Sequence, residues 1–242
     1  MSSLGVISFY TRYAVVTSKS VDQASTMHQN ARWFFDFVSP FSYLQFRTLH
    51  RLPDSLELNL TPVLFAGLLA HWGQKGPAEI SPKRVDTYRY CRWYATNSNI
   101  PFKMPPAHPF NPLPFLRLAV ALDCEPEIIK VIFHYIWAKG KPAHTTEGFL
   151  DLASSLGIND PELVISNTGA KDILRRNTDS AIAAGIYGVP TTLINEERFW
   201  GIDQTQMMLD YLDNPQLVEA PEMKRLINLP QGAIRRPQPA KT

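Results

Sequence analysis

An aromatic segment that stops at a Ser-Pro pair limits the possible folds of this chain more than any other feature. The segment covers residues 31–38 and is apolar almost throughout, which is typical of a strand covered on both faces. Ser39 and Pro40 follow directly. Serine is a favoured helix N-cap, and proline is best tolerated at the first helical position. The junction therefore predicts a strand that passes straight into a helix.

The next segments extend this start into a β-α-β unit. Apolar residues recur at helical spacing through residues 41–49. Residues 56–61 then alternate between leucine and polar side chains, as a strand does, and the pattern ends at Pro62.

A long helical segment separates this unit from a second group of strands. Most of residues 63–185 carry apolar side chains at helical spacing, most clearly over residues 126–137. Strands are predicted again at 191–194 and 198–200, and a last helix is predicted to start at Asp203. The order is therefore β-α-β, a helical insertion, then β-β-α, which predicts an α/β fold with a thioredoxin-like core.

Four sequence regions follow from this order. Residues 31–62 and 186–214 are predicted to form the core, and residues 63–185 form an all-helical insertion within it. Residues 1–30 are predicted to be an N-terminal extension, because they contain too little arginine for a targeting peptide. Residues 215–242 are rich in proline and basic side chains, which predicts a solvent-exposed tail.

Charge and hydropathy exclude two kinds of partner. The formal net charge is +2, with 24 Lys+Arg against 22 Asp+Glu, so no basic stripe is available for a phosphate backbone. The longest apolar stretch, residues 63–70, is far shorter than the roughly 18 residues that suggest a bilayer span. We therefore expect neither a nucleic-acid nor a membrane partner.

The cysteines and histidines predict neither disulfide nor metal chemistry. Cys91 and Cys124 are too far apart in the sequence for a CxxC redox pair or a zinc site. Both are predicted to be ordinary buried thiols, and this usage fits the reducing cytoplasm. The histidines show no metal-binding spacing, so we expect no metal.

Two local motifs carry the candidate chemistry. Ser39 by itself is explained fully as a helix cap. Val189-Pro190 leads into a strand, and by itself predicts a trans bond, because only about 5% of X-Pro bonds in folded proteins are cis. In thioredoxin-like folds, however, a cis-proline before the third strand faces the N-terminus of the first helix across a small cleft. The two motifs are therefore expected to face each other.

Five motifs also occur in the order found in a known family. They are Ser39-Pro40-Phe41-Ser42, Lys75-Gly76-Pro77-Ala78-Glu79, His108-Pro109-Phe110-Asn111-Pro112-Leu113-Pro114, Gly188-Val189-Pro190 and Trp200-Gly201-Ile202-Asp203. Through them the chain resembles the 2-hydroxychromene-2-carboxylate isomerases and the related kappa-class glutathione transferases, in the DsbA-like branch of the thioredoxin superfamily. The resemblance implies glutathione as cofactor, a small aromatic carboxylate as substrate, and a homodimer.

The resemblance places the glutathione sulfur at Ser39. A free thiol has a pKa of about 8.5 and is mostly protonated at neutral pH. The serine hydroxyl and the positive end of the helix can both stabilise the thiolate. Ser39 is then a thiolate stabiliser and not a nucleophile, because no His and Asp are evidently arranged to take its proton.

Further glutathione contacts follow from the same resemblance. The residues assigned to them are Val189, Pro190, Trp200, Gly201, Ile202 and Asp203. Val189 offers backbone groups to the cysteinyl part, and the turn before the last helix offers N–H groups to the glutamyl carboxylate. Asp203 either pairs with the glutamyl ammonium or caps the helix. Ile202 stands where the family usually has a polar residue, so no side-chain hydrogen bond is assigned to it.

Four residues are assigned to the second substrate. They are Gln74, Lys75, Asn111 and Pro112. Lys75 either meets a carboxylate or is a solvated surface charge. Asn111-Pro112 follows the isomerase pattern more than the transferase pattern, and it also suits a connector into the next helix.

An aromatic cluster over residues 88–94 has two interpretations. Its members are Tyr88, Tyr90, Trp93 and Tyr94. They either line an aromatic substrate pocket or pack in the core or a dimer interface.

The leading hypothesis is a glutathione-dependent isomerase that interconverts 2-hydroxychromene-2-carboxylate and trans-o-hydroxybenzylidenepyruvate, a reaction of naphthalene-type aromatic catabolism. Reversible thiolate addition turns a double bond into a rotatable single bond, so a nucleophilic cofactor helps. The main alternative is a kappa-like transferase that conjugates an electrophile. A non-enzymatic glutathione-binding protein is a further alternative. A disulfide oxidoreductase is disfavoured, because residues 39–42 contain no cysteine.

Overall fold

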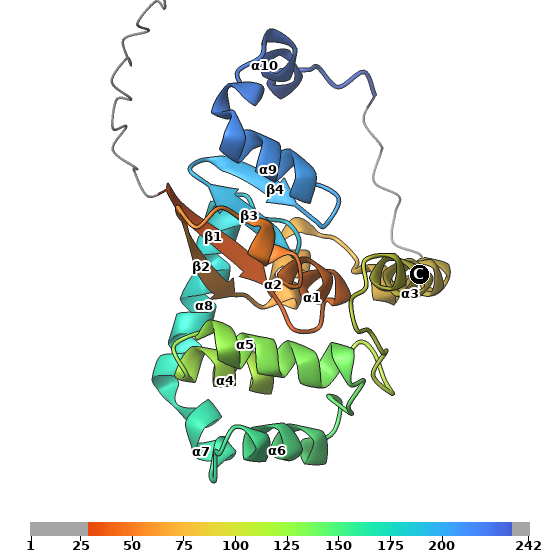
Figure 1. Cartoon of the computed structure of the whole chain (residues 1–242), viewed down its shortest axis with the longest axis vertical. Coiled ribbons are helices and arrows are strands. Elements are labelled where there is room, and N and C mark those ends of the chain that lie inside the picture. The colour runs from red at the N-terminus through yellow and green to blue at the C-terminus, as the bar shows by residue number, and fades with distance from the viewer. Residues whose placement is uncertain (1–28, 234–242) are drawn as a thin grey trace, which may run out of the picture.

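A four-stranded mixed sheet lies at the centre of the computed structural model, which describes residues 29–233 (Figure 1). The strands are β1 (Gln29–Phe35), β2 (Leu56–Pro62), β3 (Thr191–Ile194) and β4 (Glu197–Trp200), in the order β2-β1-β3-β4. β1 pairs in parallel with β2 and antiparallel with β3, and β3 pairs antiparallel with β4. The predicted α/β class, with β-α-β and β-β-α halves, is confirmed.

Helices connect and cover these strands. Between β1 and β2 lie α1 (Pro40–Phe46) and the short 3-10 helix η1 (Leu49–Arg51). Between β2 and β3 lie α2 (Phe65–Trp72), η2 (Pro77–Glu79), α3 (Ser81–Asn97), α4 (Leu113–Ala121), α5 (Pro126–Phe133), the π-helical η3 (His134–Ala138), α6 (Thr146–Ser155), α7 (Pro161–Ser166) and α8 (Thr168–Ala183). After β4 come α9 (Thr205–Asp213), η4 (Pro215–Leu217) and α10 (Pro221–Ile227).

β1 supplies both sides of the core, because successive residues of a strand point to opposite faces. Trp33 and Phe35 are fully buried on one face, where they contact Phe133 of α5. Phe34 is fully buried on the other face and packs with Leu68 of α2. The sheet is thus covered on both faces, as the continuous apolar run predicts.

β1 is shorter than the predicted strand of residues 31–38. It ends at Phe35, because the Asp36 carboxylate accepts the Val38 N–H at 3.0 Å and the Ser39 N–H donates to the Asp36 carbonyl at 3.1 Å. These bonds turn the chain and set the direction of α1. The predicted helical insertion is also interrupted, because residues 100–112 form no helix.

The C-terminal region differs from the prediction in two ways. α9 begins at Thr205 with Gln204 at its N-cap, so Asp203 neither starts nor caps this helix. Residues 215–227, predicted to lie in a proline-rich tail, contain η4 and α10. Most of their side chains are exposed.

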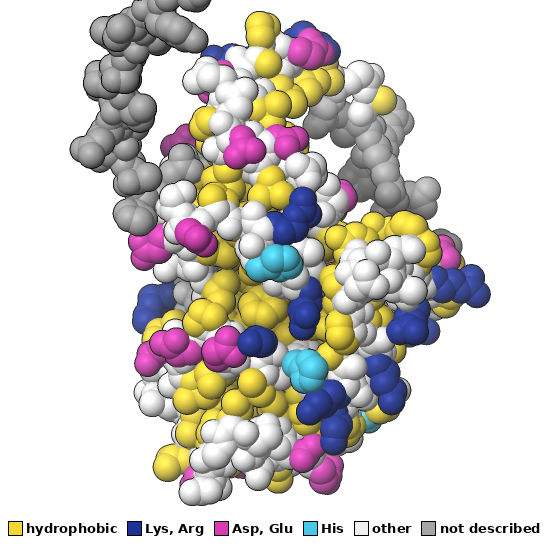
Figure 2. Space-filling model, viewed as in Figure 1, with side chains coloured by type: hydrophobic (Ala, Val, Ile, Leu, Met, Phe, Trp, Pro, Cys, Tyr) yellow, Lys and Arg dark blue, Asp and Glu magenta, His cyan; other side chains and the backbone are white. Residues whose placement is uncertain are grey.

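The predicted extension of residues 1–30 lies outside the described residues except for its last two, and residues 234–242 of the predicted tail also lie outside them. Within residues 29–233, no helix has both the length and the hydropathy needed to cross a bilayer. Figure 2 shows acidic and basic side chains together on one face of the molecule, with apolar side chains between them.

Candidate active site

The candidate site is built where β1 passes into α1. Ser39 occupies the N-cap of α1 and Pro40 is its first residue, as predicted. Ser39 Oγ accepts the Ser42 N–H at 3.2 Å and donates to the Val189 carbonyl oxygen at 3.4 Å. The residue is only 5% exposed. Its hydroxyl is therefore held between the positive end of α1 and the segment that precedes β3.

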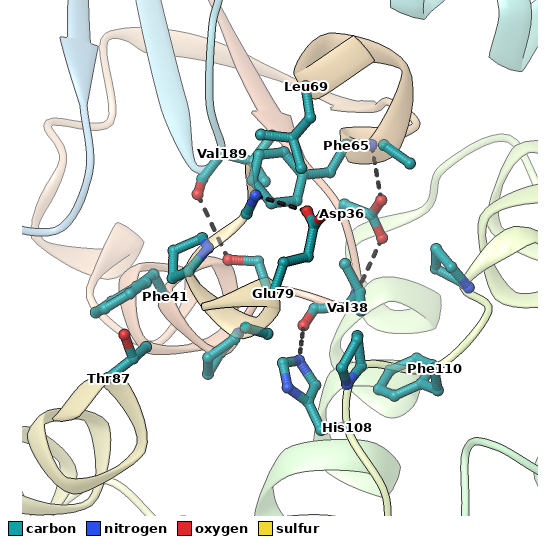
Figure 3. Close-up of a pocket in the computed structure, with 18 of the residues that line it drawn as sticks. Asp36, Val38, Phe41, Phe65, Leu69, Glu79, Thr87, His108, Phe110 and Val189 are labelled. Atoms are coloured by element: carbon teal, nitrogen blue, oxygen red, sulfur yellow. Dashed lines mark hydrogen bonds between the residues drawn. The ribbon is translucent and has the colours of Figure 1, made fainter. Parts of the chain in front are cut away.

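The segment before β3 faces α1, as predicted. The Val189-Pro190 peptide bond is cis. Val189 lines the same cavity as Ser39, and its carbonyl oxygen accepts the Ser39 hydroxyl, a bond drawn as the dashed line at Val189 in Figure 3. The structure thus brings together two motifs that lie 150 residues apart in the sequence.

A buried glutamine joins α1 to the turn between β4 and α9. Gln45 accepts the Trp33 Nε1–H at 2.7 Å and donates to the Gly201 carbonyl at 3.0 Å and to Thr205 Oγ1 at 3.1 Å. These bonds set the position of the turn relative to Ser39. Sequence reasoning missed Gln45, because a polar residue in an amphipathic helix ordinarily indicates its exposed face.

Two of the four N–H groups of the turn from Trp200 to Asp203 are bonded within the protein. The Trp200 N–H donates to Gln204 Oε1 at 2.8 Å, and the Gly201 N–H donates to the Pro190 carbonyl at 2.9 Å. Within the described residues, the N–H groups of Ile202 and Asp203 have no protein acceptor. The Ile202 side chain is buried in the main core, whereas Asp203 is exposed.

A cavity of about 250 Å³ opens beside Ser39 (Figure 3). Its walls come from the β1–α1 junction, α2, η2, α3 and residues 108–112. The lining is mostly apolar and includes Phe41, Phe65 and Phe110. Among the described residues that line it, none is a lysine or an arginine. Such a cavity suits an aromatic body better than an anionic group.

Only one of the four predicted substrate residues lines this cavity. That residue is Pro112. Asn111 is exposed, and its side chain accepts a backbone N–H at the start of α4 at 3.1 Å, which supports the structural interpretation. Gln74 and Lys75 are also exposed. They adjoin Gly76, which lines the cavity, so they lie near its rim.

Asp36 is a buried carboxylic acid in the cavity wall. Its oxygens accept the Val38 N–H at 3.0 Å and the Phe65 N–H at 2.9 Å (Figure 3). Burial raises the pKa of Asp36 to about 7, although both hydrogen bonds lower it. Asp36 therefore ties the β1–α1 junction to the start of α2. Sequence reasoning gave Asp36 no role, and the signal that could have identified it is a single acidic residue within a strand segment that is apolar almost throughout.

His108 and Tyr88 form a hydrogen-bonded pair that also lines the cavity. His108 Nε2 lies 2.7 Å from the Val38 carbonyl oxygen, and Nδ1 lies 2.6 Å from Tyr88 Oη. Burial lowers the pKa of His108, although the bond to Val38 raises it, so the ring is neutral at pH 7. Burial raises the pKa of Tyr88, so its phenol stays protonated. The sequence analysis offered Tyr88 as one of the aromatic residues that either line a substrate pocket or pack in the core or a dimer interface, but it gave His108 no role.

Most of the predicted aromatic cluster lies away from the cavity. Tyr88 lines it, whereas Tyr90 and Trp93 are 43% and 61% exposed, and their ring centroids lie 5.8 Å apart. The prediction that they pack in the core is therefore wrong for these two residues. Tyr94 is partly buried against the main core.

Neither cysteine belongs to the site. Cys91 is fully buried, as predicted, and burial raises its pKa to about 12. Cys124 is only partly buried, and burial raises its pKa to about 11. Both thiols are therefore protonated at neutral pH and poor nucleophiles. In the described part of the chain, no three potential metal ligands of the His, Cys, Asp or Glu type form a cluster.

Comparison with known proteins agrees with this architecture. Residues 32–213 match a family model described as DSBA-like thioredoxin domain. Glutathione S-transferase kappa 2 of Caenorhabditis elegans is 29% identical over 206 residues, which cover 76% of this chain and 92% of that protein. The 2-hydroxychromene-2-carboxylate isomerase of Pseudomonas putida is 26% identical over 188 residues, which cover 73% and 90%.

A solved structure has the same fold. A 2-hydroxychromene-2-carboxylate isomerase superposes with a TM-score of 0.65 at 20% sequence identity, covering 80% of this chain and 98% of the other. At this identity the likeness establishes the thioredoxin-like fold with its helical insertion, and not the reaction.

Proposed function

Because this chain belongs to the family of DSBA-like thioredoxin domains, we propose that it is a glutathione-dependent enzyme in which Ser39 stabilises the glutathione thiolate. The observation that carries the proposal is the placement of Ser39 at the α1 N-cap, with its hydroxyl directed at the segment before β3. A serine at this junction supports thiolate binding and cannot take part in disulfide exchange.

The surroundings of Ser39 suit a short peptide thiol. Val189 has peptide groups directly before β3, where an extended ligand can pair with them. The unpaired N–H groups of Ile202 and Asp203 suit a ligand carboxylate, and the exposed Asp203 side chain suits an ammonium group. A Cβ added at Gly188 would lie 2.5 Å from Trp200 Nε1, so the backbone packs closely beside this turn. Glutathione, when bound, supplies the nucleophilic sulfur.

Ser39 can serve both its helix and a thiolate. It accepts the Ser42 N–H through an oxygen lone pair, which leaves its proton for another partner. The present partner, the Val189 carbonyl, lies 3.4 Å away, whereas O–H···O bonds are usually about 2.7–2.8 Å long. The hydroxyl therefore gives up only a weak hydrogen bond when it rotates to donate to a sulfur anion. Net hydrogen bonds to charged groups contribute about 1.5–3 kcal/mol, which corresponds to a thiol pKa lowered by one to two units.

For the reaction, we propose reversible isomerisation of 2-hydroxychromene-2-carboxylate to trans-o-hydroxybenzylidenepyruvate. Support comes from the isomerase relative, which is 26% identical over 73% of this chain, and from the apolar cavity beside Ser39. The cavity takes the aromatic body, and Lys75 near its rim takes the carboxylate.

A second candidate reaction is conjugation of glutathione to an electrophile. The kappa transferase relative is 29% identical over 76% of this chain. The cavity lining also favours this reaction, because it contains the carboxyl groups of Asp36 and Glu79 and, in the described residues, no lysine or arginine. An anionic substrate group must therefore stay near the rim, whereas an uncharged electrophile has no such restriction.

One assay separates these reactions. Ultraviolet absorbance of 2-hydroxychromene-2-carboxylate is followed with and without glutathione, for the wild type and Ser39→Ala, while free glutathione is measured. An isomerase returns all the glutathione, and a transferase consumes it. Equal rates in all four conditions would overturn the proposed function.

A further inference from the structure

The Tyr88–His108 pair lines the cavity beside Ser39, and its hydrogen bonds determine what it offers to a ligand. From this geometry we propose that Tyr88, oriented by His108, is a hydrogen-bond acceptor that selects second substrates with a neutral hydroxyl group on their aromatic body. The inference rests on the proposed function, because that function makes this cavity the second-substrate site.

The first step is the position of the histidine proton. The Val38 carbonyl can only accept, so His108 Nε2, which lies 2.7 Å away, carries a hydrogen. In the neutral ring Nδ1 then has a free lone pair. Tyr88 Oη lies 2.6 Å from Nδ1 and must donate to it. The single phenol proton of Tyr88 is therefore directed at the ring and not into the cavity.

The second step covers the protonated ring. If His108 gains a proton, Nδ1–H donates to Tyr88 Oη, and the phenol proton can pass to the His108 carbonyl oxygen at 3.1 Å. In both charge states the phenol proton has an acceptor within the protein. What Tyr88 retains for a ligand is a lone pair, so it accepts and does not donate.

The third step is rigidity. The His108 ring packs against Trp137 with centroids 5.4 Å apart, and against Phe110 at 6.1 Å. Trp137 is itself held by a 2.9 Å bond from its Nε1–H to the Phe37 carbonyl. The ring cannot turn without breaking this packing, so the orientation of Tyr88 is fixed before a ligand arrives.

The fourth step is the rest of the lining. Glu79 Oε1 accepts the Gly76 N–H at 2.6 Å, and both Asp36 oxygens accept backbone N–H groups. Figure 3 shows Glu79, Asp36 and His108 around the same space. Its polar groups are thus mainly acceptors. A ligand hydroxyl complements them, whereas an ether oxygen or a carboxylate places acceptor against acceptor.

Matched binding probes test this proposal. Dissociation constants of 2-naphthol and 2-methoxynaphthalene are measured by isothermal titration calorimetry, without glutathione and at saturating glutathione. The wild type is expected to prefer 2-naphthol about fivefold, which corresponds to about 1 kcal/mol. Tyr88→Phe removes only the hydroxyl and is expected to bind both probes equally. Tyr90→Phe, on the same helix but outside the cavity lining, should keep the preference.

A second measurement uses the protein without any ligand. Nitrogen-15 NMR of His108 is expected to show the neutral tautomer protonated at Nε2. Three outcomes would overturn the proposal: a neutral tautomer protonated at Nδ1, a preference for 2-naphthol that survives in Tyr88→Phe, or a wild type that binds both probes equally or neither. If the wild type shows no glutathione-dependent turnover, that result counts against the proposed function alone. The probe preference is measured without glutathione as well, so it does not depend on turnover.

Discussion

At the scale of single residues, Ser39 shows how one hydroxyl can have a structural and a chemical role at once. Its lone pair accepts the Ser42 N–H at the start of α1, while its proton reaches only a distant acceptor, the Val189 carbonyl. The two roles use different parts of the group. They can therefore be separated only by comparing Ser39 with another helix cap.

Thr145 provides that comparison, because it caps α6 with a 3.0 Å bond to the Gly148 N–H. We expect Ser39→Ala and Thr145→Ala each to lower the free energy of unfolding by about 1 kcal/mol. Only Ser39→Ala should also raise the pKa of the bound glutathione thiol, by about one unit. Urea unfolding and the ultraviolet absorbance of the thiolate measure the two effects. A raised thiol pKa in both variants would mean that capping alone explains Ser39.

Asp36 makes the stability of the protein depend on pH. Its folded pKa of about 7 lies above the ordinary value of 3.8, so the folded state binds the proton more tightly. The tighter proton binding stabilises the folded state, and this contribution to the free energy of unfolding is fully present below about pH 4 and is lost as the pH rises towards 7. Asp36→Asn cannot ionise, so the wild type should lose about 1 kcal/mol per pH unit relative to this variant between pH 5 and 7. Urea unfolding at pH 5 and 7 measures the difference.

The control for this prediction is Asp54→Asn, because Asp54 is exposed. The difference in the free energy of unfolding between Asp54→Asn and the wild type should be the same at pH 5 and pH 7. The asparagine at position 36 can accept only one of the two N–H groups with its single oxygen, so Asp36→Asn is expected to be less stable at pH 5. A pH-independent difference would show that Asp36 is ionised throughout.

The sequence predicts a site residue when the residues next to it in the chain form a recognisable pattern. Ser39 and Val189-Pro190 were found because a cap and an X-Pro bond are local signals next to strands. Gln45 and His108 have partners far away in the chain, at Gly201 and Val38, so no local pattern identifies them. Residues that act through tertiary hydrogen bonds cannot be assigned from one sequence without the fold.

At the scale of elements, two helices that start at a proline were predicted correctly, whereas the end of β1 and the start of α9 were not. α1 and α5 begin at the prolines that predicted them, because proline fixes its own backbone angle. β1 ends three residues early because of a side-chain bond from Asp36, and the start of α9 at Thr205 was likewise missed. Asn111, one of the residues assigned to the second substrate, lies outside the cavity lining, and its side chain accepts the Leu113 N–H at the start of α4.

The close packing of β3 and β4 leads to a prediction about glutathione. A Cβ at Gly188 would lie 2.5 Å from Trp200 Nε1, so Gly188→Ala must move the indole and the turn that follows it. We expect glutathione to bind about tenfold more weakly, a loss of about 1.4 kcal/mol, measured by calorimetry. Gly232→Ala, where a Cβ meets nothing within 4 Å, should bind normally. Unchanged affinity in Gly188→Ala would exclude this turn from the glutathione site.

At the scale of the whole molecule, the predicted core and insertion share one hydrophobic interior. The largest cluster of buried residues contains Trp33 and Phe35 of β1 together with Phe133 of α5 and Leu152 of α6. Figure 1 shows α4 and α5 packed below the sheet, with α8 running from the lower helices up to it. The two sequence regions are therefore expected to unfold together and not as separate domains.

Hydrogen bonds from α8 to the strand region support this expectation. Ser180 Oγ accepts from Arg32 at 2.8 Å, Asn177 donates to the Pro62 carbonyl at 3.2 Å, and Thr178 Oγ1 accepts the Leu64 N–H at 3.0 Å. Thr178 is the most buried of these three α8 side chains, and its bond to the Leu64 N–H is partly buried. Of the three contacts, this one has the largest expected effect when removed, because a partly buried N–H left without an acceptor is costly.

Thr178→Val keeps the shape of the side chain and removes its hydroxyl, so it tests the shared interior directly. We expect the free energy of unfolding to fall by about 1–3 kcal/mol. Tryptophan fluorescence and far-ultraviolet circular dichroism should shift together to one lower urea midpoint, because Trp33 and Trp137 lie in the same core cluster. Thr96→Val removes a comparable bond on the exposed side of α3 and should change little. Two separate transitions in Thr178→Val would show that the insertion unfolds independently, and that α8 does not couple it to the sheet.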